Sequence, residues 1–219
     1  MNEIAIIYDL DETILPASAV PDATFKPLFD AIRKANKGKI SEKQLDKAFS
    51  EMKYLAIDVI SENYGFTKAM DAAAKDVLCN SHYQLDLKPF DDYEAIKKIP
   101  GIKVLVTSGV INLQQAKIDA LDIEKDFDEV VIDDLYAENR PGKKEIFARI
   151  ADKYKLKPEQ VWIVGDNPDS EITAGNELGM VTVLRINGEE KKVSGEPTFT
   201  ISSFEELRKL VSESLKINS

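Results

Sequence analysis

Short β-branched apolar runs recur along the chain, each about as long as a buried strand. They cover residues 4–8, 102–106, 130–132, 161–164 and 181–184. Because these runs are continuous and not alternating, they predict strands covered on both faces, as in a parallel sheet. Apolar residues at helical spacing separate the later runs, for example Ile146, Ile150 and Tyr154. Strands that alternate with helices predict right-handed βαβ units and an open α/β sheet.

Residues 16–90 follow a different pattern, with helical periodicity and no convincing strand. The spacing predicts three helices: one through residues 25–32, one through 45–59 after a Ser41 to Gln44 capping box, and one through 70–78. The pattern therefore predicts two domains. Residues 1–15 and 91–219 form the α/β core, and residues 16–90 form an inserted all-helical domain. We expect hinges near Leu15-Pro16 and Lys88-Pro89.

Composition and charge exclude several classes of function. The chain has 219 residues and a formal net charge of −10, with no run of basic residues, so a nucleic-acid partner is not expected. An anionic substrate therefore needs local positive charge from a cation, a lysine or backbone N–H groups. The single cysteine excludes a disulfide framework, and the single histidine excludes a polyhistidine metal site.

No apolar run approaches the length of a membrane span, which predicts a cytoplasmic protein without a membrane partner. Residues 188–195 are predicted to form a solvated loop.

Polar residues follow the ends of the predicted strands. Asp9, Asp11 and Thr13 follow the first, Thr107 and Ser108 follow the second, a lysine-containing helix start follows the third, and Asp166 and Glu171 follow the fourth. In open α/β sheets, ligands bind beyond the carboxyl ends of the strands. Each group alone could be a helix cap. Four such groups in order, each at a strand end, favour a shared phosphate site.

The residue types suit phosphoryl transfer. One of two aspartates a residue apart can attack phosphorus and form an aspartyl-phosphate. The other can protonate the leaving oxygen and later activate water. Mg²⁺ with oxygen ligands would shield the attacking carboxylate, and Asp166 would be a further ligand. Thr107 can donate a hydrogen bond to a phosphoryl oxygen, and a lysine can neutralise charge.

Residues 9–13, Thr107 and residues 165–171 resemble, in order, the first, second and fourth motifs of the haloacid dehalogenase superfamily. The helical insertion looks like the mobile cap of its C1 type. The resemblance implies a Rossmann-like parallel sheet in the core. It also implies Asp9 as nucleophile, Asp11 as general acid and base, and Thr13 as a residue that positions the turn.

The same resemblance implies the ligands of the site. Mg²⁺ would be held by Asp9, the backbone carbonyl of Asp11 and Asp166, with Glu171 in an outer shell. The substrate-binding residues would be Thr13, Thr107, Ser108 and Lys143.

The third motif departs from the family pattern, in which Lys-Pro often precedes an Ile-Phe pair by a few residues. Here Arg140-Pro141 precedes Ile146-Phe147, with lysines in between. Lys143 is the first choice for the cation because it follows the glycine at the helix start. Lys144 and Arg140 remain alternatives.

These observations predict a Mg²⁺-dependent phosphatase that hydrolyses a small phosphorylated metabolite. A phosphomutase of the same superfamily is the alternative, because it would use the same motifs. A non-catalytic regulatory protein is disfavoured, since Asp9 and Asp11 are both present. No pattern in the insertion indicates the substrate, and none in the chain indicates an oligomeric state.

Overall fold

The computed structural model describes residues 3–188 and 195–217, so the predicted loop at 188–195 lies largely outside the described residues. Six parallel strands form one sheet in the order β3-β2-β1-β4-β5-β6. They are β1 (Ala5–Tyr8), β2 (Ile102–Gly109), β3 (Glu129–Asp134), β4 (Val161–Gly165), β5 (Val181–Arg185) and β6 (Phe199–Ile201). The predicted parallel α/β sheet is confirmed. The edge strand β6 was not predicted, because it has three residues and only one of them is buried.

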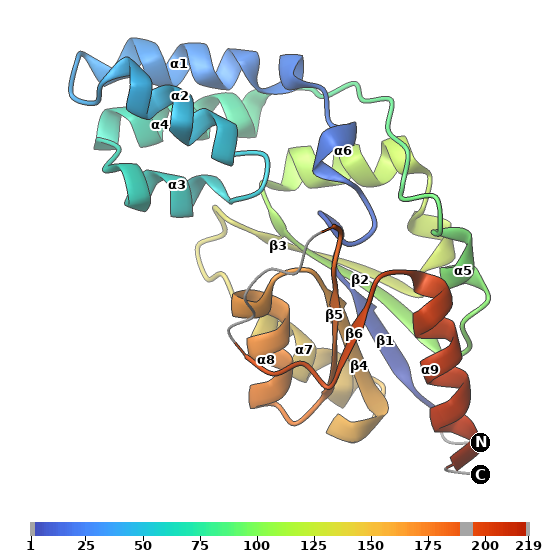
Figure 1. Cartoon of the computed structure of the whole chain (residues 1–219). Coiled ribbons are helices and arrows are strands. Elements are labelled where there is room, and N and C mark those ends of the chain that lie inside the picture. The colour runs from blue at the N-terminus through green and yellow to red at the C-terminus, as the bar shows by residue number, and fades with distance from the viewer. Residues whose placement is uncertain (1–2, 189–194, 218–219) are drawn as a thin grey trace.

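Helices cover both faces of the sheet (Figure 1). On one face lie α7 (Gly142–Lys153) and α8 (Thr173–Glu177); on the other lie α5 (Glu94–Lys97), α6 (Ile111–Leu121) and α9 (Phe204–Ile217). Neighbouring residues of β1 separate onto the two faces. Ile7 packs in the apolar cluster of α7, and Tyr8 packs in the cluster of α9. This double burial explains why the strand sequences are continuously apolar. Among the described residues, no helix is long and apolar enough to cross a membrane.

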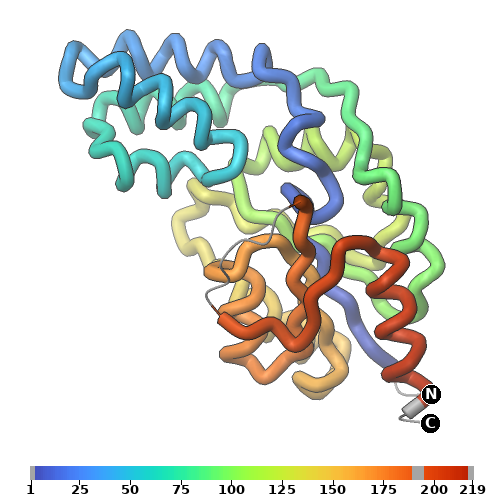
Figure 2. Tube along the Cα trace, viewed as in Figure 1, coloured from blue at the N-terminus to red at the C-terminus, as the bar shows by residue number. Residues whose placement is uncertain are grey.

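Four of the helices between β1 and β2 stand over the carboxyl ends of the strands (Figures 1 and 2). We call them the helical insertion: α1 (Lys26–Asn36), α2 (Glu42–Glu51), α3 (Ile57–Tyr64) and α4 (Lys68–Asn80). Short turns complete the described chain: η1 (Ala17–Ala19), η2 (Asp22–Phe25), η3 (Glu124–Asp126), η4 (Pro158–Gln160) and the π-helical η5 (Pro168–Ile172).

The prediction of one helix through residues 45–59 is wrong. The helix ends at Glu51, and Ala56 has extended backbone (φ −64°, ψ 151°) where α3 begins. The apolar spacing stays in phase across the break, so periodicity alone could not reveal it. The break lets α3 turn back beside α2 and bury Ile60 completely. It also leaves Tyr54 63% exposed at the mouth of the cavity described below.

The predicted capping box opens α2. Ser41 Oγ accepts from Gln44 N at 3.4 Å, and Ser41 N donates to Gln44 Oε1 at 3.3 Å. The two segments that join the insertion to the sheet lie side by side, since Phe90 N donates to Ile14 O at 2.9 Å. This pairing brings the two predicted hinge regions together.

Candidate active site

Asp9 is the first residue after β1. Its N–H donates to the carbonyl of Val164 at 2.9 Å, which holds it against the neighbouring strand β4. The residue is only 7% exposed, and its Oδ1 lies 2.6 Å from Lys143 Nζ. Burial raises the pKa of Asp9 well above its ordinary value; Lys143 opposes this, while the carboxylates of Glu171 and Asp166 add to it. Asp9 therefore sits where negative charge is crowded and a cation is favoured.

Lys143 is the cation that contacts Asp9. It is the second residue of α7, and its ammonium also binds Glu171. Burial acts to lower the pKa of Lys143, but Asp9 and Glu171 together raise it, so the ammonium stays charged. The two alternatives are engaged elsewhere: Lys144 pairs with Glu177 at 2.7 Å on the surface, and Arg140 pairs with Asp133.

Asp133, at the end of β3, ties the start of α7 to the sheet. Its buried carboxylate accepts from Ser108 Oγ at 2.8 Å, from Arg140 Nε at 2.9 Å and from Gly142 N at 3.3 Å. Burial acts to raise the pKa of Asp133, but the hydrogen bonds from Arg140 and Ser108 hold it below its ordinary value. The sequence analysis missed this residue. The available signal was its position directly after the apolar run 130–132, at a strand end like the others.

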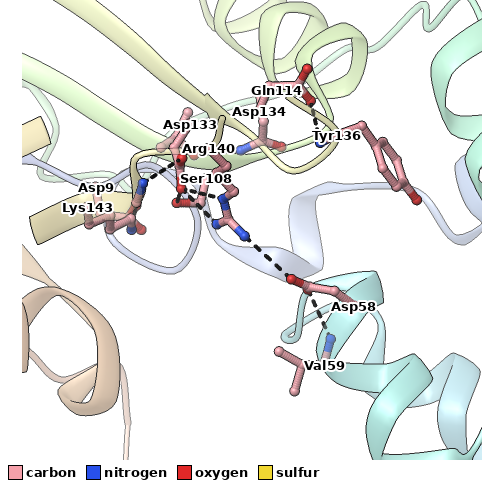
Figure 3. A network of polar contacts seen from close by, with 12 residues as sticks. Asp9, Asp58, Val59, Ser108, Gln114, Asp133, Asp134, Tyr136, Arg140 and Lys143 are labelled. Atoms are coloured by element: carbon pink, nitrogen blue, oxygen red, sulfur yellow. Dashed lines mark hydrogen bonds and ion pairs between the residues drawn. The ribbon is translucent and has the colours of Figure 1, made fainter. Parts of the chain in front are cut away.

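Arg140 links the core to the helical insertion (Figure 3). One guanidinium nitrogen lies 2.7 Å from Asp133, and another lies 3.5 Å from Asp58 Oδ2 on α3. The side chain of Asp58 is 53% exposed, so water screens this second contact.

We expect Asp58→Ala to lower the free energy of unfolding by less than about 1 kcal/mol, because an exposed ion pair contributes little. Urea unfolding of the variant and the wild type measures the difference. A loss of several kcal/mol would show that this contact holds the insertion in place.

Asp11 is bound by two residues of α6 that the sequence analysis did not single out. Lys117 Nζ lies 2.8 and 2.9 Å from the two carboxylate oxygens, and Gln114 Nε2 donates to one of them at 3.0 Å. The same Gln114 nitrogen donates to Thr107 Oγ1 at 2.6 Å. The available signal was a glutamine and a lysine three residues apart on a helix face that also carries Leu113.

The turn after β1 buries Thr13. Glu12 adopts a positive φ of 54°, and the backbone N–H groups of residues 13–15 all donate to the carbonyl of Leu10. Thr13 is fully buried and is not among the residues that line the cavity. This location fits a residue that shapes the turn, and it does not bring Thr13 to the predicted substrate site.

A cavity of about 620 Å³ lies between the carboxyl ends of the strands and the insertion. It is lined on the sheet side by Asp9, Asp11, Thr107, Ser108, Lys143 and Asp166, and on the insertion side mainly by Phe25, Leu28, Met52, Leu55 and Val59. The structure thus brings the predicted residues of all four strand ends to one cavity, except Thr13.

The oxygen donors at the floor of this cavity fit a hard divalent cation. The carboxylates of Glu171 and Asp166 lie close enough to Asp9 to raise its pKa, and Lys143 opposes them, which leaves an excess of negative charge. Among residues 3–188 and 195–217, no three carboxylate, imidazole or thiolate groups form a preassembled metal site. Mg²⁺ does not need one, because it binds through one or two carboxylates and keeps several waters.

Glu171 shapes the loop after β4. Its Oε2 accepts from Asn167 N at 3.1 Å, and the residue is 3% exposed. A Cβ at Gly165 would lie 2.5 Å from Glu171 Cγ, so glycine is needed where the strand passes this carboxylate. Glu171 thus both caps the following turn and faces Lys143.

Comparisons with known proteins agree with this geometry. Residues 5–179 match the family model of a haloacid dehalogenase-like hydrolase. A glyceraldehyde 3-phosphate phosphatase from Methanopyrus kandleri is 28% identical over 97% of this chain and 98% of its own. A protein of the same name from Methanocaldococcus jannaschii is 27% identical over 94% of this chain and 96% of its own.

Among solved structures, the HAD-hydrolase YfnB from Bacillus subtilis, bound to magnesium, superposes with a TM-score of 0.56 at 17% identity. The match covers 96% of this chain and 99% of that one, and it shows a shared fold. The family model covers most of the chain and includes the residues of all four strand ends. The protein therefore belongs to the haloacid dehalogenase-like hydrolase family.

Proposed function

We propose that this chain is a Mg²⁺-dependent phosphatase that hydrolyses a small phosphorylated metabolite through an aspartyl-phosphate on Asp9. The observation that carries the proposal is the pairing of Asp9 with Lys143 at 2.6 Å on the floor of the cavity between the sheet and the insertion. The family match and the two relatives named as phosphatases, which align over nearly their whole length, support a phosphoric monoester hydrolase.

The residues divide the reaction into two steps. An oxygen of Asp9 attacks phosphorus, the bond from phosphorus to the leaving oxygen breaks, and Asp11 gives its proton to that oxygen. Water then attacks phosphorus, Asp11 takes the proton of the water, and the bond to Asp9 breaks to release phosphate. Thr107 and Lys143 stabilise the negative charge that shifts onto the phosphoryl oxygens.

Asp9, Asp166 and the backbone carbonyl of Asp11 would hold Mg²⁺. The ion would supply the positive charge that lets a carboxylate approach a phosphate dianion. Glu171 would act behind these ligands by holding Lys143.

The helical insertion is proposed to be a cap domain of residues 16–90 that moves about the paired connections at Ile14 and Phe90. Closing it would exclude water from the aspartyl-phosphate until Asp11 activates one molecule. The exposed contact of Arg140 with Asp58 is weak enough to break and reform during this motion.

We propose a short, uncharged organic group for the substrate, as in glyceraldehyde 3-phosphate. The insertion side of the cavity is mainly apolar, and its charged residues are already paired, Lys53 with Asp22 and Asp58 with Arg140. A substrate carboxylate would have to displace one of these pairs. The names of the two full-length relatives support the same choice. A cytoplasmic location stays a prediction.

The test is phosphate release from a panel of glyceraldehyde 3-phosphate, phosphoglycolate, a hexose phosphate and a nucleoside monophosphate. EDTA is expected to reduce release to background, and Mg²⁺ in excess is expected to restore it, because the crowded carboxylates need a cation. Full activity in chelator would contradict the metal role. Release from no compound by the folded protein would contradict the phosphatase proposal and favour a mutase assay.

A further inference from the structure

Helix α6 carries two polar side chains on its buried face. Gln114 is 2% and Lys117 is 6% exposed, while the same face also buries Leu113, Ile118 and Leu121. A buried lysine costs free energy unless it is paired, and a hydrophobic residue of similar volume often packs as well or better. Packing alone therefore does not explain a lysine at this position.

Both side chains reach the carboxylate of Asp11. Lys117 Nζ contacts the two oxygens at 2.8 and 2.9 Å, and Gln114 Nε2 contacts one of them at 3.0 Å. Asp11 lies on a turn with its side chain 37% exposed, so without these bonds several rotamers would be open to it. The three contacts select one orientation.

Gln114 connects this carboxylate to Thr107. Its amide nitrogen donates to Thr107 Oγ1 at 2.6 Å, which leaves the hydroxyl hydrogen of Thr107 available to another acceptor. A Cβ at Gly109 would lie 2.7 Å from Gln114 Cγ, so the glycine at the end of β2 makes room for the glutamine. The glycine at the end of β2 thus allows the side chain of Gln114 to reach Thr107.

We propose that Lys117, supported by Gln114, is a positioning residue that holds Asp11 for proton transfer to the leaving oxygen. This inference rests on the proposed phosphatase function. The step it serves is the first one, in which the Asp9 oxygen bonds to phosphorus, the ester P–O bond breaks, and the leaving oxygen takes a proton from the carboxylic acid of Asp11. The contacts of Lys117 and Gln114 with both oxygens are those of the carboxylate that remains after this transfer, so Lys117 would stabilise the group that the step produces. A misplaced acid loses much of this contribution, because proton transfer requires hydrogen-bond geometry.

The experiment compares Lys117→Met with Lys125→Met. Lys125 is a matched control because its side chain is 62% exposed and pairs with Asp122 away from the cavity. For each protein, kcat/KM is measured on p-nitrophenyl phosphate and on the alkyl phosphate that the wild type cleaves best. The p-nitrophenolate ion leaves without a proton, whereas an alkoxide needs one.

We expect Lys117→Met to lower kcat/KM about 100-fold on the alkyl phosphate and less than about threefold on p-nitrophenyl phosphate. Lys125→Met is expected to match the wild type on both. Lys117→Gln keeps an N–H donor on a side chain one bond shorter and serves as a second variant, for which we expect the same difference between the two esters but a smaller loss. Fluorescence of Trp162, which is 2% exposed, reports whether each variant is folded.

An equal loss on both esters in a folded variant would overturn the proposal, because it would indicate a general structural or binding role. No loss on either ester would overturn it as well. If the wild type releases phosphate from neither ester, the phosphatase function itself fails, and the assignment of Lys117 fails with it.

Discussion

Asp9→Asn is expected to lose at least about 10⁴-fold in kcat, because removal of a covalent nucleophile leaves only the residual effect of binding and charge stabilisation. The amide matches the carboxylate in size but cannot form the aspartyl-phosphate. Burial and the neighbouring carboxylates already raise the pKa of Asp9, so a neutral group in its place suits the site. The loss of activity should therefore not reflect a loss of fold.

Phosphate release under saturating Mg²⁺ measures this effect, and urea unfolding followed by Trp162 fluorescence measures stability. The matched control is Asp152→Asn, on the exposed side of α7, which should keep full activity. We expect the free energy of unfolding of Asp9→Asn to stay within about 2 kcal/mol of the wild type. Substantial turnover by folded Asp9→Asn would remove Asp9 from its proposed role.

Lys143→Met is expected to reduce both activity and stability. It removes the ammonium that binds Asp9 and Glu171, and breaking a buried pair by removing one partner costs about 3 kcal/mol or more. Loss of charge stabilisation at the phosphoryl group is expected to lower kcat by about 100-fold or more.

The neighbouring lysine is the control for this prediction. Lys144→Met removes a surface pair with Glu177 in which both side chains are more than half exposed, so it should cost less than about 1 kcal/mol and leave kcat unchanged. Equal effects of the two substitutions on kcat and stability would show that Lys143 has no special role at the site.

The stability defect of Lys143→Met should depend on pH in a defined direction. Without the ammonium, the pKa of Asp9 in the folded state rises further above the ordinary value of about 4. A carboxyl group with a raised folded-state pKa binds more protons when folded, so stability falls as pH rises through that pKa. Unfolding in EDTA should therefore show the largest defect near neutral pH and a smaller one toward pH 4. A loss of unfolding free energy that becomes larger as the pH falls would contradict the inference that carboxylates are crowded around Asp9.

The predicted fold followed from local features of the sequence. Continuous apolar runs mark strands buried on both faces, and Ile7 and Tyr8 do pack on opposite faces of the sheet. The order of polar groups after the strands placed Asp9, Asp11, Thr107 and Asp166 at one edge, because parallel strands share that edge. Residue type and spacing are enough for these predictions.

Other features depend on how elements dock, and spacing does not contain that information. Arg140, Lys143 and Lys144 lie within five residues, and only the rotation of α7 against the sheet turns Lys143 toward Asp9 and Lys144 toward Glu177. The docking of α6 likewise aims Gln114 and Lys117 at Asp11 from about a hundred residues away.

The sequence by itself determined the parallel α/β core, the helical character of the insertion and the chemical types that gather at the strand ends, because each depends on short-range periodicity and order. The tertiary structure alone decided the break between α2 and α3, the addition of β6, the burial of Thr13 behind its turn and the partners of each charged group. These features depend on contacts between segments distant in the sequence, where burial and pairing outweigh local preference.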